Sequence, residues 1–82
     1  MTVQAKLFVM TVQAKLFGRR LMRARKNRQL TQLQLAERIG TSMTTISRYE
    51  NGLSFPSKRR LSEIAHFLGV KVDWLLTGFK ED

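Results

Sequence analysis

The chain has 82 residues, and 15 Lys and Arg residues against 6 Asp and Glu residues give it a formal net charge of +9 at pH 7. Apolar residues make up 43% and charged residues 26% of the chain, which is an ordinary globular composition and excludes bulk disorder and collagen. The length allows one domain, whose core is too small for a typical enzyme cleft.

Several classes of chemistry are excluded by residues that the chain lacks. It contains no Cys and a single His, His66, so it cannot form a disulfide framework, a thiolate metal site or a histidine-rich zinc cluster. We find no paired carboxylates, no glycine-rich phosphate loop and no catalytic triad context, and therefore expect no enzyme, no cofactor and no small-molecule ligand. The longest apolar run, residues 7–10, is far below the roughly 20 residues that span a bilayer. We expect a cytoplasmic protein that does not associate with membranes.

The positive charge is concentrated in the N-terminal half of the chain. Residues 1–36 contain eight basic and no acidic residues, whereas residues 37–82 contain seven basic and six acidic residues. Such a bias attracts polyanions, among which nucleic acid is the commonest partner. A solvated basic face without a partner is the alternative. An acidic membrane surface is a weaker one, because it needs an apolar face opposite the cations and the only Trp is distant, at position 74.

The first 16 residues contain a duplication. The octapeptide MTVQAKLF occupies residues 1–8 and again residues 10–17. We expect Met10 to be the native start, with the first copy added by duplication or by expression design. Apolar residues alternate weakly with polar ones over residues 1–9, which is a weak strand signal. We interpret residues 1–16 as a short arm, and an extended strand that pairs with the arm of a second subunit is one hypothesis for it.

From residue 15 onward the apolar spacing is helical. It predicts an all-α fold, a compact bundle of five short helices over residues 15–28, 32–39, 43–50, 57–68 and 72–77. Thr31 and Ser42 are suited to cap the second and third helices, and Gly40 and Gly69 to end the second and fourth. The predicted division is an arm (1–16), a domain (17–78) and a tail (79–82). The predicted core consists of Phe17, Leu21, Ala24, Leu35, Ala36, Ile39, Ile46, Tyr49, Leu61, Ile64, Ala65, Leu68, Trp74 and Leu75.

The second and third helices are separated only by Gly40–Thr41–Ser42. Two helices joined by a short turn with a glycine at its start form a helix-turn-helix, in which one helix crosses the DNA backbone and the other enters the major groove. On a helical wheel, Ile46 and Tyr49 fall on one side of the third helix. The opposite side, within an arc of about 140°, holds a small mixed surface suited to reading bases. It consists of Met43, Thr44, Ser47 and Arg48.

Residues 17–78 resemble the lambdoid phage repressor and Cro type of helix-turn-helix domain, the XRE-like family. The resemblance covers about three quarters of the chain in one unbroken register. It is carried by Leu30–Thr31–Gln32, Leu35–Ala36–Glu37, Gly40, Ile46–Ser47–Arg48–Tyr49–Glu50–Asn51–Gly52, Pro56, Leu68–Gly69–Val70 and Val72–Asp73–Trp74–Leu75–Leu76–Thr77–Gly78.

The resemblance implies roles for the matching residues. The base contacts fall to the four outward residues of helix 43–50; Arg48 is suited to a bidentate contact to guanine, and Met43 offers only apolar contact. The implied phosphate contacts are Gln32, Ser42 and Asn51. Arg25 and Glu50 match a buried ion pair of some relatives. Each role has a structural alternative: Ser42 as a helix cap only, Asn51 as a turn residue, Thr44 and Ser47 as solvated residues, and the ion pair as an exposed one.

These observations predict a sequence-specific transcriptional regulator that binds double-stranded DNA. By resemblance it is a homodimer on palindromic half-sites roughly 34 Å apart. The interface is expected at the last helix and its surroundings (Trp74, Leu76, Phe79), at the arm, or at both. Three alternatives remain open: an antitoxin that binds a toxin, a restriction–modification controller protein, and the DNA-binding part of a longer repressor.

Overall fold

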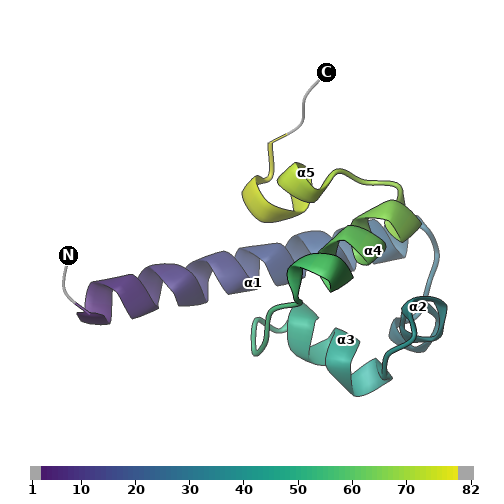
Figure 1. The fold of residues 1–82 in the computed structure, drawn as a ribbon, viewed down its shortest axis with the longest axis horizontal. Coiled ribbons are helices and arrows are strands. Elements are labelled where there is room, and N and C mark those ends of the chain that lie inside the picture. The colour runs from purple at the N-terminus through teal and green to yellow at the C-terminus, as the bar shows by residue number, and fades with distance from the viewer. Residues whose placement is uncertain (1–2, 80–82) are drawn as a thin grey trace.

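The computed structural model describes residues 3–79, and these residues form helices and connecting loops without any strand. The predicted all-α fold with five helices is confirmed (Figure 1). The bounds of the last four helices agree with the predicted ranges to within one residue. The helices are α1 (Val3–Asn27), α2 (Gln32–Ile39), α3 (Met43–Glu50), α4 (Lys58–Leu68) and α5 (Val72–Thr77).

The N-terminal segment is where the structure departs from the expectation. Residues 3–16 are not extended; they continue α1, which runs for 25 residues. The strand interpretation was wrong because the alternation over residues 1–9 is weak, whereas Gln, Ala, Lys, Leu and Met all favour helix. A helix also satisfies its backbone hydrogen bonds internally, which a lone strand cannot do. The predicted boundary between arm and domain falls inside α1, while residues 1–2 and residues 80–82 of the tail lie outside the described residues.

Local signals in the sequence set the ends of the inner helices. Thr31 and Gln34 form a capping box at the start of α2: the Gln34 backbone N–H donates to Thr31 Oγ1 (3.1 Å), and the Thr31 N–H donates to Gln34 Oε1 (2.8 Å). Gly40 ends α2 with φ of 74°, in the left-handed region that favours glycine. Ser42 caps α3 and Ser57 caps α4, so α2, α3 and α4 each begin directly after a hydroxyl residue.

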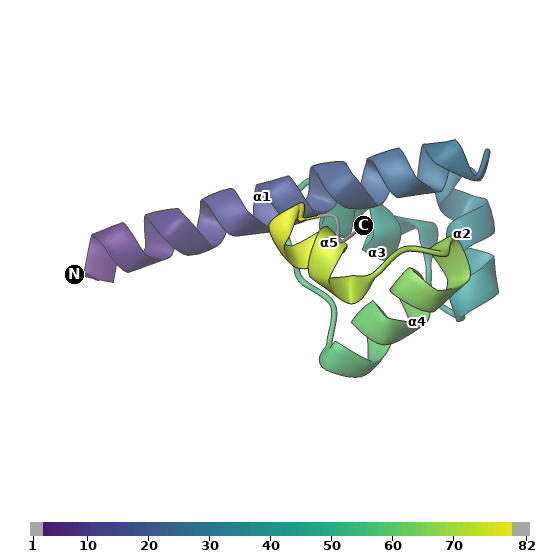
Figure 2. The same ribbon diagram turned by 90° about the horizontal axis from the view of Figure 1, so that it is seen from above.

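The core is the cluster that the apolar spacing predicts. Its members come from all five helices, and only Trp74 of the predicted set is half-buried, packing against the cluster rather than inside it. Figures 1 and 2 show that α1 passes between α5 on one side and the α2–α3 pair on the other. The buried set consists of Phe17, Leu21, Ala24, Leu35, Ala36, Ile39, Ile46, Tyr49, Leu61, Ile64, Ala65, Leu68 and Leu75.

Helices α1 and α3 approach each other closely at Gly18. A Cβ atom at Gly18 would lie 2.6 Å from the carbonyl oxygen of Tyr49 and would also overlap the carbonyl oxygen of Glu50. Only glycine leaves room for this contact between the middle of α1 and the last turn of α3. The long helix therefore supports the back of α3, and the opposite side of α3 faces outward.

No helix among the described residues is both long enough and apolar enough to cross a membrane.

Candidate nucleic-acid interface

The outward side of α3 carries the four residues expected to contact bases. The side chains of Met43, Thr44 and Arg48 are exposed, and Ser47 is half-buried. On the opposite side, Ile46 is fully buried and Tyr49 is nearly so. Helix α3 is thus anchored from behind by two core residues, and its front presents a thioether, two hydroxyl groups and a guanidinium group. This mixture offers both donors and apolar surface, as a reader of base edges requires.

Ser42 organises the N-terminal end of this surface. Its Oγ accepts a hydrogen bond from the Thr45 backbone N–H (3.1 Å) and lies 2.9 Å from Thr45 Oγ1. The cap therefore satisfies one of the free N–H groups of the first turn and leaves others directed outward. An exposed helix N-terminus with such donors suits a phosphate oxygen.

Asn51 and Ser47 are joined at the C-terminal end of α3. The Asn51 side-chain amide donates to the Ser47 carbonyl oxygen (2.8 Å) and lies 3.3 Å from Ser47 Oγ. These bonds use the amide hydrogens that the resemblance assigns to a phosphate. A phosphate contact by Asn51 would require this amide to leave Ser47, whereas the Ser47 hydroxyl keeps its own hydrogen for a base or a phosphate.

Glu50 is the centre of a buried polar network behind α3. Its carboxylate forms a bidentate pair with Arg25, with Nε–Oε2 at 2.6 Å and Nη2–Oε1 at 3.0 Å, and the two side chains are 9% and 0% exposed. Arg25 Nη1 also donates to the Leu30 carbonyl oxygen (2.7 Å). Gln32 Nε2 donates to Glu50 Oε1 (3.0 Å), so the first residue of α2 is tied to the last residue of α3. Among the described residues no buried side-chain nitrogen or oxygen atom lacks a partner.

The Gln32 side chain is not free to point at a phosphate, because it is bonded to Glu50. One hydrogen of its amide is engaged by Glu50, and the second remains available at the N-terminus of α2. Sequence reasoning missed this link because the two residues are 18 positions apart. It also missed the close approach at Gly18, although a glycine inside a helical pattern is a recognised signal of backbone contact.

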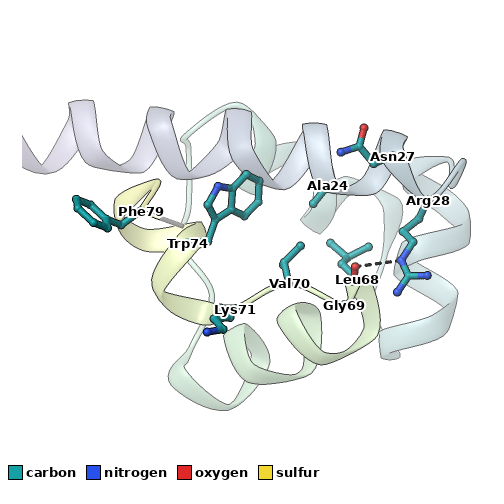
Figure 3. A pocket seen from close by; sticks show the side chains of 9 residues that line it. All are labelled: Ala24, Asn27, Arg28, Leu68, Gly69, Val70, Lys71, Trp74 and Phe79. Atoms are coloured by element: carbon teal, nitrogen blue, oxygen red, sulfur yellow. Dashed lines mark hydrogen bonds between the residues drawn. The ribbon is translucent and has the colours of Figure 1, made fainter. Parts of the chain in front are cut away.

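A concave feature lies away from α3. It is a cavity of about 350 Å³ between the C-terminal half of α1, the connection from α4 to α5, and α5 itself (Figure 3). Arg28 closes one end, where its Nε donates to the Leu68 carbonyl oxygen (3.0 Å), and Phe79 lies toward the other. Trp74 points toward α1 between them. The cavity borders none of the seven residues predicted to contact DNA, so it is separate from the candidate interface on α2 and α3.

Two short helices joined through a left-handed glycine, with the second helix anchored behind and exposed in front, define a helix-turn-helix protein. Residues 21–75 match the model of the family described as Helix-turn-helix. The chain belongs to this family, in the lambdoid repressor or XRE-like group that its motifs indicate.

Two similar proteins that are named as transcriptional regulators support this family assignment. The chain is 40% identical over 62 residues to the HTH-type transcriptional activator BcrR of Enterococcus faecalis, a match that covers 76% of this chain and 30% of BcrR. It is 39% identical over 56 residues to the phage CTXphi transcriptional repressor RstR of Vibrio cholerae, covering 68% of this chain and 50% of RstR. The matches span at most half the length of these two relatives.

A solved structure shows the same fold. The P22 c2 repressor, crystallised in complex with a synthetic operator, superimposes with a TM-score of 0.75 at 30% sequence identity. The superposition covers 78% of this chain and 97% of the repressor chain. The two chains therefore share nearly the whole of the repressor's architecture.

Proposed function

We propose that this chain is a transcriptional regulator that binds double-stranded DNA in a sequence-specific manner, with α3 in the major groove. The observation that carries the proposal is the construction of α3: core residues Ile46 and Tyr49 hold it from behind, and its front is exposed and rich in donors. The family membership and the operator complex of the similar P22 c2 repressor support the same class of partner.

We assign direct reading of bases to Met43, Thr44, Ser47 and Arg48. Arg48 is the only one that can make a bidentate contact to the O6 and N7 atoms of guanine. Thr44 and Ser47 offer single hydroxyl contacts, and Met43 offers apolar contact to a thymine methyl group. The side chains are short apart from Arg48 and Met43, so the helix axis has to enter the groove deeply for all four to reach base edges.

We assign contact with the phosphate backbone to Gln32, Ser42 and Asn51, which lie at the ends of α2 and α3. Gln32 and Ser42 stand at helix N-termini, where unpaired N–H groups and the helix dipole favour an anion. Asn51 can join them only by exchanging its bonds to Ser47 for a phosphate oxygen. Phosphate contacts of this kind fix the register of the protein on the duplex without selecting its sequence.

We further propose that the regulator works as a homodimer on a palindromic operator in the cytoplasm. A single α3 reads few base pairs, and two-fold dimers solve this by placing two such helices about 34 Å apart, one turn of the DNA. The net charge of +9 supplies the long-range attraction to DNA for either arrangement.

The decisive experiment is selection of a binding site from random duplexes, followed by titration of the selected duplex at several salt concentrations. About six phosphate contacts predict that the logarithm of the association constant falls with the logarithm of salt at a slope of about −5 or steeper. A palindromic consensus with two half-sites one turn apart supports the dimer. Absence of any enriched sequence, or a binding constant insensitive to salt, contradicts the proposal.

A further inference from the structure

One face of α1 is apolar from Met10 to Ala24. Five apolar residues follow one another at intervals of four and three positions, the spacing of a heptad repeat. We call this set the α1 stripe. It consists of Met10, Ala14, Phe17, Leu21 and Ala24. The last three are buried in the domain core, so the C-terminal half of the stripe is already covered by the other helices.

The N-terminal half of the stripe lies beyond the domain. Figures 1 and 2 both show α1 running well past α2, α3, α4 and α5 at its N-terminal end. Met10, where the stripe begins, is 56% exposed, and Ala14 is half-buried. A helix of a few turns is marginally stable in water unless its apolar face packs against something. The heptad spacing predicts that this cover is another helix.

The loop between α3 and α4 enlarges the same apolar surface. It lies beside α1 where the stripe leaves the core. The ring centroids of Phe55 and Phe17 are 4.6 Å apart, and a Cβ atom at Gly52 would lie 2.8 Å from Lys15 Cγ. Phe55 is nevertheless 49% exposed and Leu53 is 67% exposed. Since Met10 is two turns before Phe17 on the same face, Phe55 extends the surface that Met10 begins, and Leu53 lies two residues before Phe55 in the same loop.

We propose that this surface, the N-terminal half of the α1 stripe with Leu53 and Phe55, is covered by the same surface of a second copy of the chain. The inference rests on the proposed homodimer and names its interface. The two stripes would pair as helix on helix, with the loop residues packed at one end of the pair.

The low charge of the projecting part of α1 allows a second copy to approach at this place. Two chains of net charge +9 repel each other, and between residues 3 and 14 the only charged residue is Lys6, so the projecting part of α1 is where two copies approach with least repulsion. The stripe itself contains no charged residue, so it selects a partner by apolar shape, and a heptad stripe is complementary to an identical one.

The area needed by a stable dimer explains why the loop belongs to the surface. A specific interface buries about 800 Å² on each partner, more than three turns of one helix offer. Leu53 and Phe55 add exposed apolar area next to the stripe. The four base-reading residues of α3 are not members of this surface.

The test compares Met10→Asp with Val12→Asp in the full chain by sedimentation equilibrium without DNA. Both variants place the same charge on the projecting helix, but Val12, which is 38% exposed, lies on the opposite side from the stripe because two residues turn a helix by about 200°. We expect Met10→Asp to raise the dimer dissociation constant about 100-fold or more, because it places an unpaired charge in an apolar interface. Val12→Asp should leave the constant nearly unchanged, and Met10→Leu should preserve the dimer.

A wild-type chain that stays monomeric at all concentrations overturns the proposal. A larger effect of Val12→Asp than of Met10→Asp also overturns it, and moves the interface to the other side of α1. Circular dichroism of each variant checks that the domain remains folded. We expect the same helix content in all variants, because Met10 lies outside the core.

Titration of the same variants with DNA separates this inference from the proposed function. We expect Met10→Asp to bind a duplex with one half-site as the wild type does, and to lose the additional affinity for a duplex with two half-sites. A dimer that depends on Met10 but does not bind DNA would leave this inference standing and refute the proposed function. Dimeric binding to DNA that is unaffected by Met10→Asp would support the proposed function and refute this inference.

Discussion

Arg25 and Glu50 join the last turn of α1 to the last residue of α3 through a bidentate ion pair at 2.6 Å and 3.0 Å. The pair sits directly behind the candidate interface, and Gln32 extends it to the first residue of α2. One carboxylate thus connects the three helices that determine where α3 points. Because both charges are buried and satisfied, we expect the pair to fix the relative orientation of these helices more than it adds net stability.

Removing one member of this pair should strongly destabilise the domain. We expect Arg25→Ala to lower the free energy of unfolding by about 3–5 kcal/mol, because Glu50 would be left as an uncompensated buried charge. Urea denaturation measures the change. The matched control is Arg59→Ala, which breaks an exposed pair with Glu63 (3.3 Å) and should cost about 1 kcal/mol or less. Equal effects of the two substitutions would show that the buried pair behaves like a surface pair.

Glycine at position 18 should be required for the contact between α1 and α3. In a helix, Gly18→Ala would ordinarily stabilise by about 1 kcal/mol, but the new methyl group would overlap the carbonyl oxygens of Tyr49 and Glu50. We therefore expect a net loss of about 1–3 kcal/mol in thermal or urea unfolding.

Gly40→Ala is the comparison for this substitution. A Cβ atom there would meet no atom within 4 Å, so its cost of about 1–2 kcal/mol comes only from the left-handed φ of 74°. At a fixed temperature, Gly18→Ala should also weaken DNA binding, because it displaces α3. The Gly40→Ala variant, when folded, should bind DNA more tightly than Gly18→Ala does. A stabilising effect of Gly18→Ala would refute the close approach.

Two substitutions at Ser42 should separate capping from phosphate contact. Ser42→Ala removes the cap of α3 and should cost about 0.5–2 kcal/mol of stability. Ser42→Asp keeps a capping oxygen and places a negative charge at the helix N-terminus, so stability should be retained. We expect Ser42→Asp to weaken binding to all duplexes through repulsion of the phosphate backbone. Unchanged DNA affinity in Ser42→Asp would show that Ser42 is a cap only.

Arg48 and Gln32 should affect DNA binding in different ways. Arg48→Ala should cost about 1–3 kcal/mol at one base pair of the selected site and relax the preference there, whereas Gln32→Ala should weaken binding to all sequences alike. Competition assays with single-base variants of the site measure both. Arg48→Lys keeps the charge but loses the bidentate fork, so it should relax the preference as Arg48→Ala does.

Arg23→Ala is the charge control for Arg48→Ala. Arg23 is exposed and lies two residues before Arg25, which faces α3, so it stands on the far side of α1. It should reduce affinity slightly and leave the base preference intact. The same loss of preference from Arg48→Ala and Gln32→Ala would show that the division into base and phosphate contacts is wrong.

The bounds of α2, α3, α4 and α5 and the residues of the core could be read from the sequence, because these signals are local. Hydroxyl caps at Thr31 and Ser42, the left-handed glycine at position 40 and apolar residues at helical spacing act within one or two turns. The outward side of α3 follows from the same periodicity, since a residue's side of a helix depends only on its position along it.

Tertiary structure decided what depends on residues far apart in the sequence. The bond from Gln32 to Glu50 and the fit of Gly18 against the end of α3 exist only once three helices have packed, and no local pattern specifies which atoms then meet. The N-terminal segment shows the same limit in another form. Its sequence contains both a weak alternation and a heptad spacing of apolar residues. The segment forms a helix, in which the backbone groups can hydrogen-bond within their own chain.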